Sequence, residues 1–110
     1  QYRYTQGVLL LMDIKHQRSL YSEMLAAAEL TRQGYEVLFN MADNGLVDIV
    51  ALNTDTGEVK LYDVKTKSYR KDGSMIHRVP RPRQKKIGVE IYYVDRFDME
   101  DLNENSNAGC

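Results

Sequence analysis

The sequence predicts an α/β domain in which the elements follow the order α-β-β-β-α-β. One long segment has helical periodicity, three extended segments follow it across short turns, and a short helix with a last apolar strand completes the pattern. The 110 residues suffice for one domain with one core. With 43% hydrophobic and 28% charged residues, the composition is that of an ordinary globular protein, which excludes collagen-like structure and general disorder.

The first element is a helix expected over 19–33. Ser19 fits the N-cap position, and Gly34 fits the left-handed position that follows a last helical turn. Ser22 and Glu29 fall on the side opposite the apolar residues. The residues that recur at helical spacing, and that predict the buried face, are Leu20, Met24, Ala27 and Thr31.

Three extended segments are expected next, at 35–41, 46–53 and 58–68. Residues 54–57 (TDTG) lie between the last two and are typical of a hairpin turn. Both faces of the segment 46–53 carry apolar side chains. This pattern indicates a strand in the middle of a sheet that is covered on both sides.

The second half of the chain begins with an exposed segment. Residues 69–80 are expected to form a loop or short hairpin that turns at 71–74 (KDGS). A short helix is expected over 82–86, opened by its proline and ended by Gly88. The apolar segment 89–94 (VEIYYV) predicts the last strand.

Both ends of the chain are expected to lie outside this domain. Met12 begins a stretch that reads like a natural start, so we expect 1–11 to be leader or vector sequence and 12–98 to be the folded domain. Residues 99–110 are polar and acidic, which predicts a flexible tail.

Charge is segregated along the chain, although the formal net charge is only −1. The segment 60–86 carries +8 and the rest of the chain carries −9. This separation predicts one basic face or loop on an otherwise acidic protein, and its alternative is a solvated surface without a partner.

Several classes of site are excluded by composition. Cys110 is the only cysteine, which excludes an internal disulfide and a cysteine-rich zinc site. His16 and His77 are too far apart in the sequence to indicate a histidine metal site. No apolar stretch approaches the ~20 residues that span a bilayer, so we expect no membrane partner and a cytoplasmic location.

The hairpin around 54–57 brings chemistry-bearing residues together. A turn centred between Asp55 and Thr56 pairs residues whose numbers sum to 111, which places Asp48 opposite Asp63. A turn centred one residue later places Asp48 opposite Lys65 instead. Either register puts the three side chains on one face, because side chains alternate with period two.

A divalent cation would relieve the repulsion between two such carboxylates. Mg²⁺ takes one or two carboxylates together with water and phosphate oxygens, and the Val64 carbonyl is a further candidate ligand. Glu23 lies at the edge of the apolar stripe of the first helix, which suggests a third acid at the site. The structural alternatives are that Asp48 caps a turn, Asp63 pairs with Lys65, and Glu23 is a rim residue.

This ordered set resembles the site of the PD-(D/E)XK nucleases, which share the restriction-endonuclease-like fold. The likeness extends from about residue 13 to residue 95. Within this family, the sequence is similar to small endonucleases related to group I intron homing enzymes and to archaeal Holliday-junction resolvases. Val47 stands where the family has its name-giving proline, and the second acid is Asp rather than the commoner Glu. The segments that carry the likeness are Ser22-Glu23, Ala28-Glu29-Leu30, Gly34-Tyr35-Glu36-Val37, Asp48-Ile49-Val50 and Asp63-Val64-Lys65-Thr66.

The resemblance implies an αβββαβ core with a mixed central sheet flanked by helices, and a metal-dependent endodeoxyribonuclease activity. Asp48 and Asp63, with the Val64 carbonyl, would hold Mg²⁺ or Mn²⁺, and Glu23 would hold a second metal or a metal-bound water. Lys65 would position the attacking water or stabilise charge on phosphorus. Gln84 stands where relatives often carry a helper glutamine, and the alternative for it is a surface or phosphate contact.

DNA is therefore the expected partner, and phosphate neutralisation would supply most of the affinity. Because duplex DNA has two strands, we expect a homodimer or a larger symmetric assembly in a bacterial, archaeal or phage-infected cell. A nucleic-acid-binding protein that does not cut is the alternative function. The residues expected to contact DNA are Lys67, Tyr69, Arg70, Lys71, Arg78, Arg81, Arg83, Gln84, Lys85 and Lys86.

Overall fold

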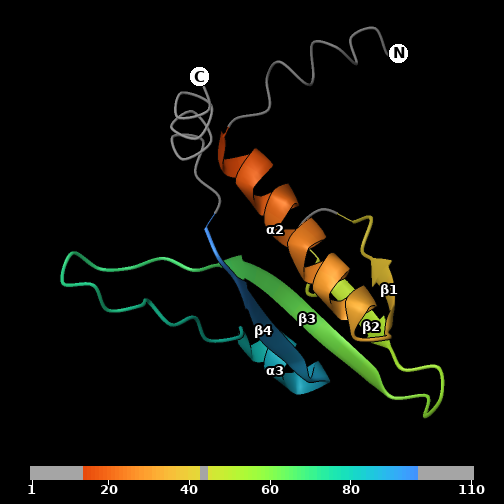
Figure 1. Ribbon diagram of the computed structural model, residues 1–110. Helices are drawn as coiled ribbons and strands as arrows, with labels where there is room; N and C mark the ends of the chain where they lie inside the picture. Colours follow the sequence, from red (N-terminus) through yellow and green to blue (C-terminus); the bar gives the residue numbers. More distant parts are fainter. Residues whose placement is uncertain (1–13, 43–44, 97–110) are drawn as a thin grey trace, which may run out of the picture.

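The computed structural model describes residues 14–42 and 45–96, which form a small α/β domain (Figure 1). Its elements are α2 (Ile14–Arg32), β1 (Glu36–Phe39), β2 (Ile49–Leu52), β3 (Val59–Thr66), α3 (Pro82–Ile87) and β4 (Val89–Val94). This is the predicted order α-β-β-β-α-β. The expected leader at 1–11 and the expected tail at 99–110 lie outside the described residues.

The four strands form one mixed sheet in the order β1-β2-β3-β4. β1, β2 and β3 are antiparallel neighbours, and β4 runs parallel to β3. The parallel pair needs a crossover, which the segment 67–81 and α3 provide. Within the hairpin, Ile49 pairs with Tyr62 and Leu52 with Val59, so the register in which paired numbers sum to 111 is confirmed.

The core lies between α2 and one face of the sheet, and α2 contacts all four strands (Figure 1). Ala26 and Leu30 of the helix pack against Ile49 of β2 and Val64 of β3, and all four are buried. Alanine at the centre of the helix face lets the helix approach the sheet closely. Removing these side chains from water stabilises the two layers against each other.

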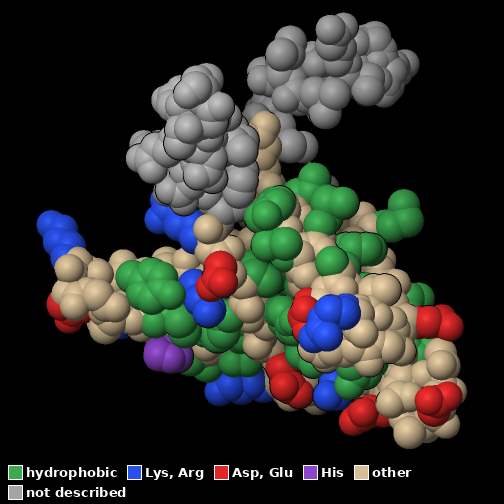
Figure 2. All heavy atoms as spheres, in the orientation of Figure 1, with side chains coloured by type: hydrophobic (Ala, Val, Ile, Leu, Met, Phe, Trp, Pro, Cys, Tyr) green, Lys and Arg blue, Asp and Glu red, His purple; other side chains and the backbone are tan. Residues whose placement is uncertain are grey.

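The predicted buried face of the first helix is wrong. Leu20 and Met24 are 50% and 58% exposed, and the buried residues are Ser22, Ala26, Ala27 and Leu30. Figure 2 shows hydrophobic side chains on the outward side of this helix. Helical spacing alone allows two neighbouring stripes that share Ala27, and packing on the sheet selects the stripe of small residues.

The predicted start of this helix is also wrong, because it begins at Ile14 rather than after Ser19. Ser19 therefore lies in the helix interior and caps nothing. At the other end the helix stops at Arg32, and Gly34 has φ 99°, as predicted. A residue without Cβ adopts this left-handed conformation at little cost.

The opposite face of the sheet has less cover than predicted. Among the described elements only α3 contacts it, along β4 and through Gln84 at Asp63 of β3. Ile49 and Ala51 of β2 are buried on the α2 side, whereas Val50 and Leu52 on the other side are half-buried. The expectation of a strand buried on both faces holds for one face only, because α3 has just six residues.

The crossover segment leaves the sheet and returns to it (Figure 1). Tyr69 and Met75 form an isolated antiparallel bridge around a turn at 71–73, which confirms the predicted short hairpin. Pro82 then opens α3, and Gly88 with φ 84° ends it. Both features were predicted from the sequence.

Candidate active site

A β-bulge stands at the start of β2. The N–H of Asp48 donates to the Tyr62 carbonyl at 2.8 Å, although Tyr62 is already the register partner of Ile49. Two consecutive residues therefore face one residue of β3, which defines a bulge. The Asp48 carbonyl turns instead toward β1 and accepts the Asn40 N–H at 3.1 Å. The bulge ends the regular ladder and re-aims the Asp48 side chain.

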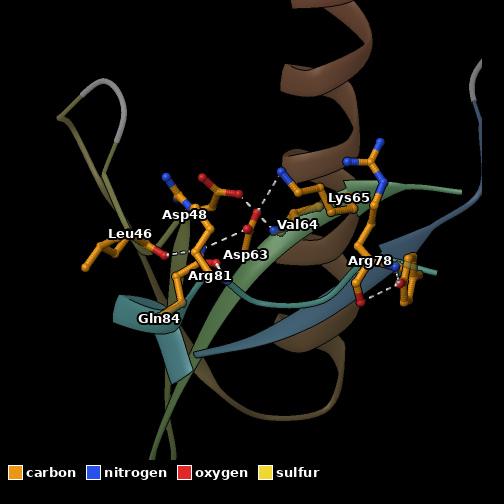
Figure 3. Close-up of polar contacts among 9 residues, drawn as sticks. Leu46, Asp48, Asp63, Val64, Lys65, Arg78, Arg81 and Gln84 are labelled. Atoms are coloured by element: carbon orange, nitrogen blue, oxygen red, sulfur yellow. Dashed lines mark hydrogen bonds and ion pairs between the residues drawn. The ribbon is translucent and has the colours of Figure 1, made fainter. Parts of the chain in front are cut away.

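The re-aimed Asp48 carboxylate is fixed by the backbone of the neighbouring strand. Its Oδ2 accepts the N–H of Val64 at 2.8 Å. Asp63 precedes Val64 on β3 and is only 7% exposed. Figure 3 shows the two carboxylates beside each other at this end of the sheet.

Lys65 shares this site with Asp63. The Lys65 Nζ lies 3.4 Å from Asp63 Oδ1, and the two side chains point to the same side because they are two residues apart on one strand (Figure 3). The structure therefore brings Asp48, Asp63 and Lys65 together, but Asp48 does not stand opposite Asp63 as predicted, because the bulge sets it against Tyr62. The ion pair between Lys65 and Asp63 that the sequence allowed as a structural alternative is also present.

Glu23 reaches the same site from α2, where it is half-buried. Burial raises the pKa of Glu23, and the Asp48 and Asp63 carboxylates raise it further. Burial also raises the pKa of Asp48, the hydrogen bond from Val64 opposes this rise, and Asp63 adds to it. The three acids thus repel one another when all are ionised.

These side chains line one pocket with a volume of about 590 Å³. Glu23, Asp48 and Asp63 supply its acids, and Lys65 and Arg81 supply its cations. The pocket is therefore a site where carboxylates, an ammonium group and a guanidinium group face one space.

Gln84 is not a surface residue, which corrects its prediction as a DNA contact. Its side chain is 1% exposed, and its Nε2 donates both to Asp63 Oδ2 and to the Leu46 carbonyl, each at 2.9 Å (Figure 3). Its Oε1 accepts the Arg81 N–H at 2.8 Å. Gln84 thus ties α3 to Asp63 and to the chain that enters the bulge. Its sequence position marked it for attention, but only the packing of α3 shows that it is buried.

The acids of this pocket differ in how well they suit a divalent metal. Within 14–42 and 45–96, no group of three His, Cys, Asp or Glu side chains could hold a metal ion. Mg²⁺ does not need three, since it binds through one or two carboxylates with water and phosphate oxygens. The hydrogen bonds to Asp48 and Asp63 use Oδ2 of each carboxylate. Oδ1 of Asp63 faces the Lys65 Nζ at 3.4 Å, so a cation bound there would share this oxygen with Lys65 or displace its ammonium group. The Asp48 and Asp63 carboxylates together suit direct coordination of Mg²⁺. Glu23 suits contact with the ion through a water molecule better than direct coordination.

The structure places the predicted DNA-contacting residues in different parts of the surface. Lys67 and Arg78 line a second pocket, with a volume of about 470 Å³, next to Lys65. Arg81 lines the acidic pocket, and Tyr69, Arg70 and Lys71 lie exposed in the crossover segment. The remaining cations lie exposed on α3 and line neither pocket, namely Arg83, Lys85 and Lys86.

Sequence reasoning missed three cations of the second pocket. Lys15 and Arg18 come from the first turns of α2, and Arg96 follows β4. None belongs to the basic segment 60–86, so charge clustering along the chain gave no signal for them. Only the extension of α2 back to Ile14 and the end of β4 place them beside Lys65.

Comparisons with known proteins find no matching family model, no matching curated protein and no matching solved structure. In the part of the chain that the structure describes, neither helix has the length and apolar character required to cross a membrane.

Proposed function

We propose that this protein is a metal-dependent DNA endonuclease of the PD-(D/E)XK type, with a restriction-endonuclease-like fold, acting in the cytoplasm. One observation carries the proposal: Asp48, Asp63 and Lys65 converge in a pocket that adjoins a second pocket lined by cations. Carboxylates beside a lysine suit phosphodiester hydrolysis, and cations beside them suit the phosphate backbone. The sequence likeness to PD-(D/E)XK nucleases supports the same reading.

Asp48 and Asp63 would hold Mg²⁺, or Mn²⁺ in its place, with the Val64 carbonyl as a further ligand. When bound, the ion would neutralise charge on the scissile phosphate and lower the pKa of a bound water. Lys65, close to Asp63, would orient the attacking water and stabilise the charge that develops on phosphorus. Glu23, whose pKa is raised at the pocket, would accept a hydrogen bond from water.

The activity is tested on supercoiled, linear and four-way-junction DNA, with Mg²⁺ and with EDTA. Asp63→Asn and Lys65→Ala are expected to lower the cleavage rate by at least about 100-fold, as for loss of a group that acts in the transition state. Asp55→Asn in the exposed hairpin turn and Lys60→Ala on the same strand as Lys65 are matched controls. Equal nicking by wild type and by both site variants would show that the site is assigned wrongly.

Metal binding has a readout that does not depend on cleavage. A ligand at 100 times its Kd stabilises the folded state by about 2.7 kcal/mol, so Mg²⁺ is expected to raise the Tm of the wild type. The double variant Asp48→Asn with Asp63→Asn is expected to lose this rise. The same rise in the double variant would place the metal elsewhere.

The second candidate function is binding of nucleic acid without cleavage. It is favoured by the cations beside Lys65, which would act whether or not the carboxylates hold a metal. DNA binding without cleavage under Mg²⁺ and Mn²⁺ would select it. A symmetric homodimer, which cutting two strands would require, is tested by sedimentation with and without DNA.

A further inference from the structure

The second pocket is lined by six cations, Lys65 among them, that come from separate parts of the fold. We name it the cationic groove. Among the described residues that line it, none is Asp or Glu. Its cations are Lys15 and Arg18 of α2, Lys65 and Lys67 of β3, Arg78 of the crossover segment, and Arg96 after β4.

The floor of the cationic groove is polar and fixed. Ser22, which is 2% exposed, and Thr66 line it and share a hydrogen bond of 2.7 Å between their hydroxyl oxygens. Ser19 and Ser68 add two further hydroxyl groups. Hydroxyls and cations together are the groups with which proteins hold phosphate oxygens.

The cations of this groove are partly held by protein partners. The Lys67 Nζ lies 3.1 Å from the exposed Asp95 carboxylate. The backbone of Arg78 is fixed because its N–H donates to the Tyr93 hydroxyl at 2.6 Å (Figure 3). Lys65 likewise lies 3.4 Å from the Asp63 carboxylate, so the two lysines that β3 and its end supply to the groove each have a carboxylate neighbour. The charges of Lys15 and Arg78 add to the groove and favour an anion there.

The acidic pocket and the cationic groove share the wall made by Ser19, Val64 and Lys65. Beyond Asp48, the far side of the acidic pocket is lined by Asn40, Ala42 and Gly45, which carry no charge. Apart from Arg81, positive charge therefore lies on one side of the carboxylates. A polyanion that enters the acidic pocket would be held mainly on the side of Lys65.

We propose that the cationic groove is the main binding site for the phosphates of a nucleic-acid strand, and that it holds the strand on one side of the acidic pocket. The inference rests on the proposed function for the identity of the strand. A strand of DNA carries one phosphate per about 3.4 Å of helix axis, so the phosphates next to the one in the acidic pocket fall in the adjoining groove. The exposed cations of α3 contribute little, although they belong to the basic segment of the sequence.

The experiment measures binding of a fluorescent oligonucleotide in EDTA, so that cleavage plays no part. Lys15→Ala and Arg78→Ala are each expected to weaken binding about 5- to 10-fold and to reduce the salt slope by about 0.7 to 0.9. Lys60→Ala and Arg32→Ala, which remove cations outside the groove, are the controls. The triple replacement of Arg83, Lys85 and Lys86 by alanine is expected to change binding less than twofold.

The inference would be overturned if both groove variants bound the oligonucleotide as tightly as the wild type. It would also be overturned if the α3 triple variant lost more affinity than the groove variants. Tight binding to phosphatidylglycerol vesicles with none to the oligonucleotide would also overturn it. Absence of cleavage under every metal, with weakened binding by the groove variants, would reject the nuclease and keep the groove. If the wild type cuts DNA, single phosphates on either side of the cut can be replaced by neutral methylphosphonate linkages. Replacement on one side of the cut is expected to weaken binding, and replacement on the other side is not. Equal weakening on both sides would contradict the proposed one-sided binding.

Discussion

The side chain of Gln84 donates a hydrogen bond to the carboxylate of Asp63 across 2.9 Å, at a position where Gln84 is 1% exposed. The same amide group donates to the Leu46 carbonyl, and its oxygen accepts the Arg81 N–H. One side chain therefore links α3, the chain that enters the bulge, and an acid of the candidate site. An orientation of Asp63 suited to binding a cation depends on a residue that lines neither pocket.

Gln84→Ala is expected to destabilise the protein by at least about 2 kcal/mol, because it leaves buried polar groups without partners at about 1–3 kcal/mol each. Urea unfolding measures this change, with Gln17→Ala on the exposed side of α2 as the control. If Gln84 also orients Asp63, the variant loses the Mg²⁺-dependent rise in Tm while it remains folded at low temperature. A loss below about 0.5 kcal/mol would show that water replaces the amide.

The crowded acids predict a pH dependence of stability in EDTA. Because the pKa of Glu23 is raised, the folded protein holds a proton that the unfolded chain loses near the ordinary glutamate pKa of 4.5. At pH values between the ordinary pKa and the raised pKa of Glu23, the folded state binds more protons than the unfolded state. The contribution of Glu23 to stability therefore falls as pH rises. Glu23→Gln is expected to remove this fall and to be the more stable protein at pH 7.

Urea unfolding from pH 4 to pH 7 checks this prediction through the difference between Glu23→Gln and wild type. Glu36→Gln, which changes an exposed carboxylate on β1, is the control. Curves for Glu23→Gln and wild type that stay parallel would contradict it. A gain in stability when an acid of the candidate site is replaced is the trade-off between stability and function that is expected where like charges are crowded.

The hydrogen bond between Ser22 and Thr66 predicts a measurable coupling between α2 and β3. Ser22→Ala and Thr66→Val are each expected to cost about 1 kcal/mol. The double variant is expected to cost about 1 kcal/mol less than the sum, because it leaves no unpaired hydroxyl at the bond. A double-mutant cycle by urea unfolding measures the coupling, and strict additivity would exclude it.

The two faces of α2 give a matched pair of variants. Leu30→Ala is expected to cost about 2–5 kcal/mol, because Leu30 is buried and its removal leaves a cavity. Met24→Ala is expected to lie within about 0.5 kcal/mol of wild type, because Met24 is 58% exposed. Thermal or urea unfolding compares them, and equal costs would place the core on the wrong side of the helix.

Much of the fold follows from short-range patterns in the sequence. The turn at 54–57 and period-two alternation predict the register of β2 and β3, because both depend on neighbours along the chain. That register is enough to bring Asp63 and Lys65 to one side and Asp48 near them. Pro82 and Gly88 likewise predict the bounds of α3, since each restricts or frees its own backbone.

Other features depend on contacts between residues far apart in the sequence. Periodicity could not decide which stripe of α2 is buried, because the sheet selects Ala26 and Leu30 through the fit of two layers. The bulge at Asp48 and the burial of Gln84 arise where β2, β3 and α3 meet. They required the packed structure.

The order of the elements, the hairpin register and the residue types that meet on it can be predicted from the amino-acid sequence, because each depends on local backbone geometry. Which cations lie beside Lys65 depends on packing between distant parts of the chain. Lys15 and Arg96, at opposite ends of the described chain, line the same groove because α2 crosses the sheet and β4 pairs with β3. The basic segment of the sequence and the cationic groove of the fold therefore differ, because packing determines which charges share one surface.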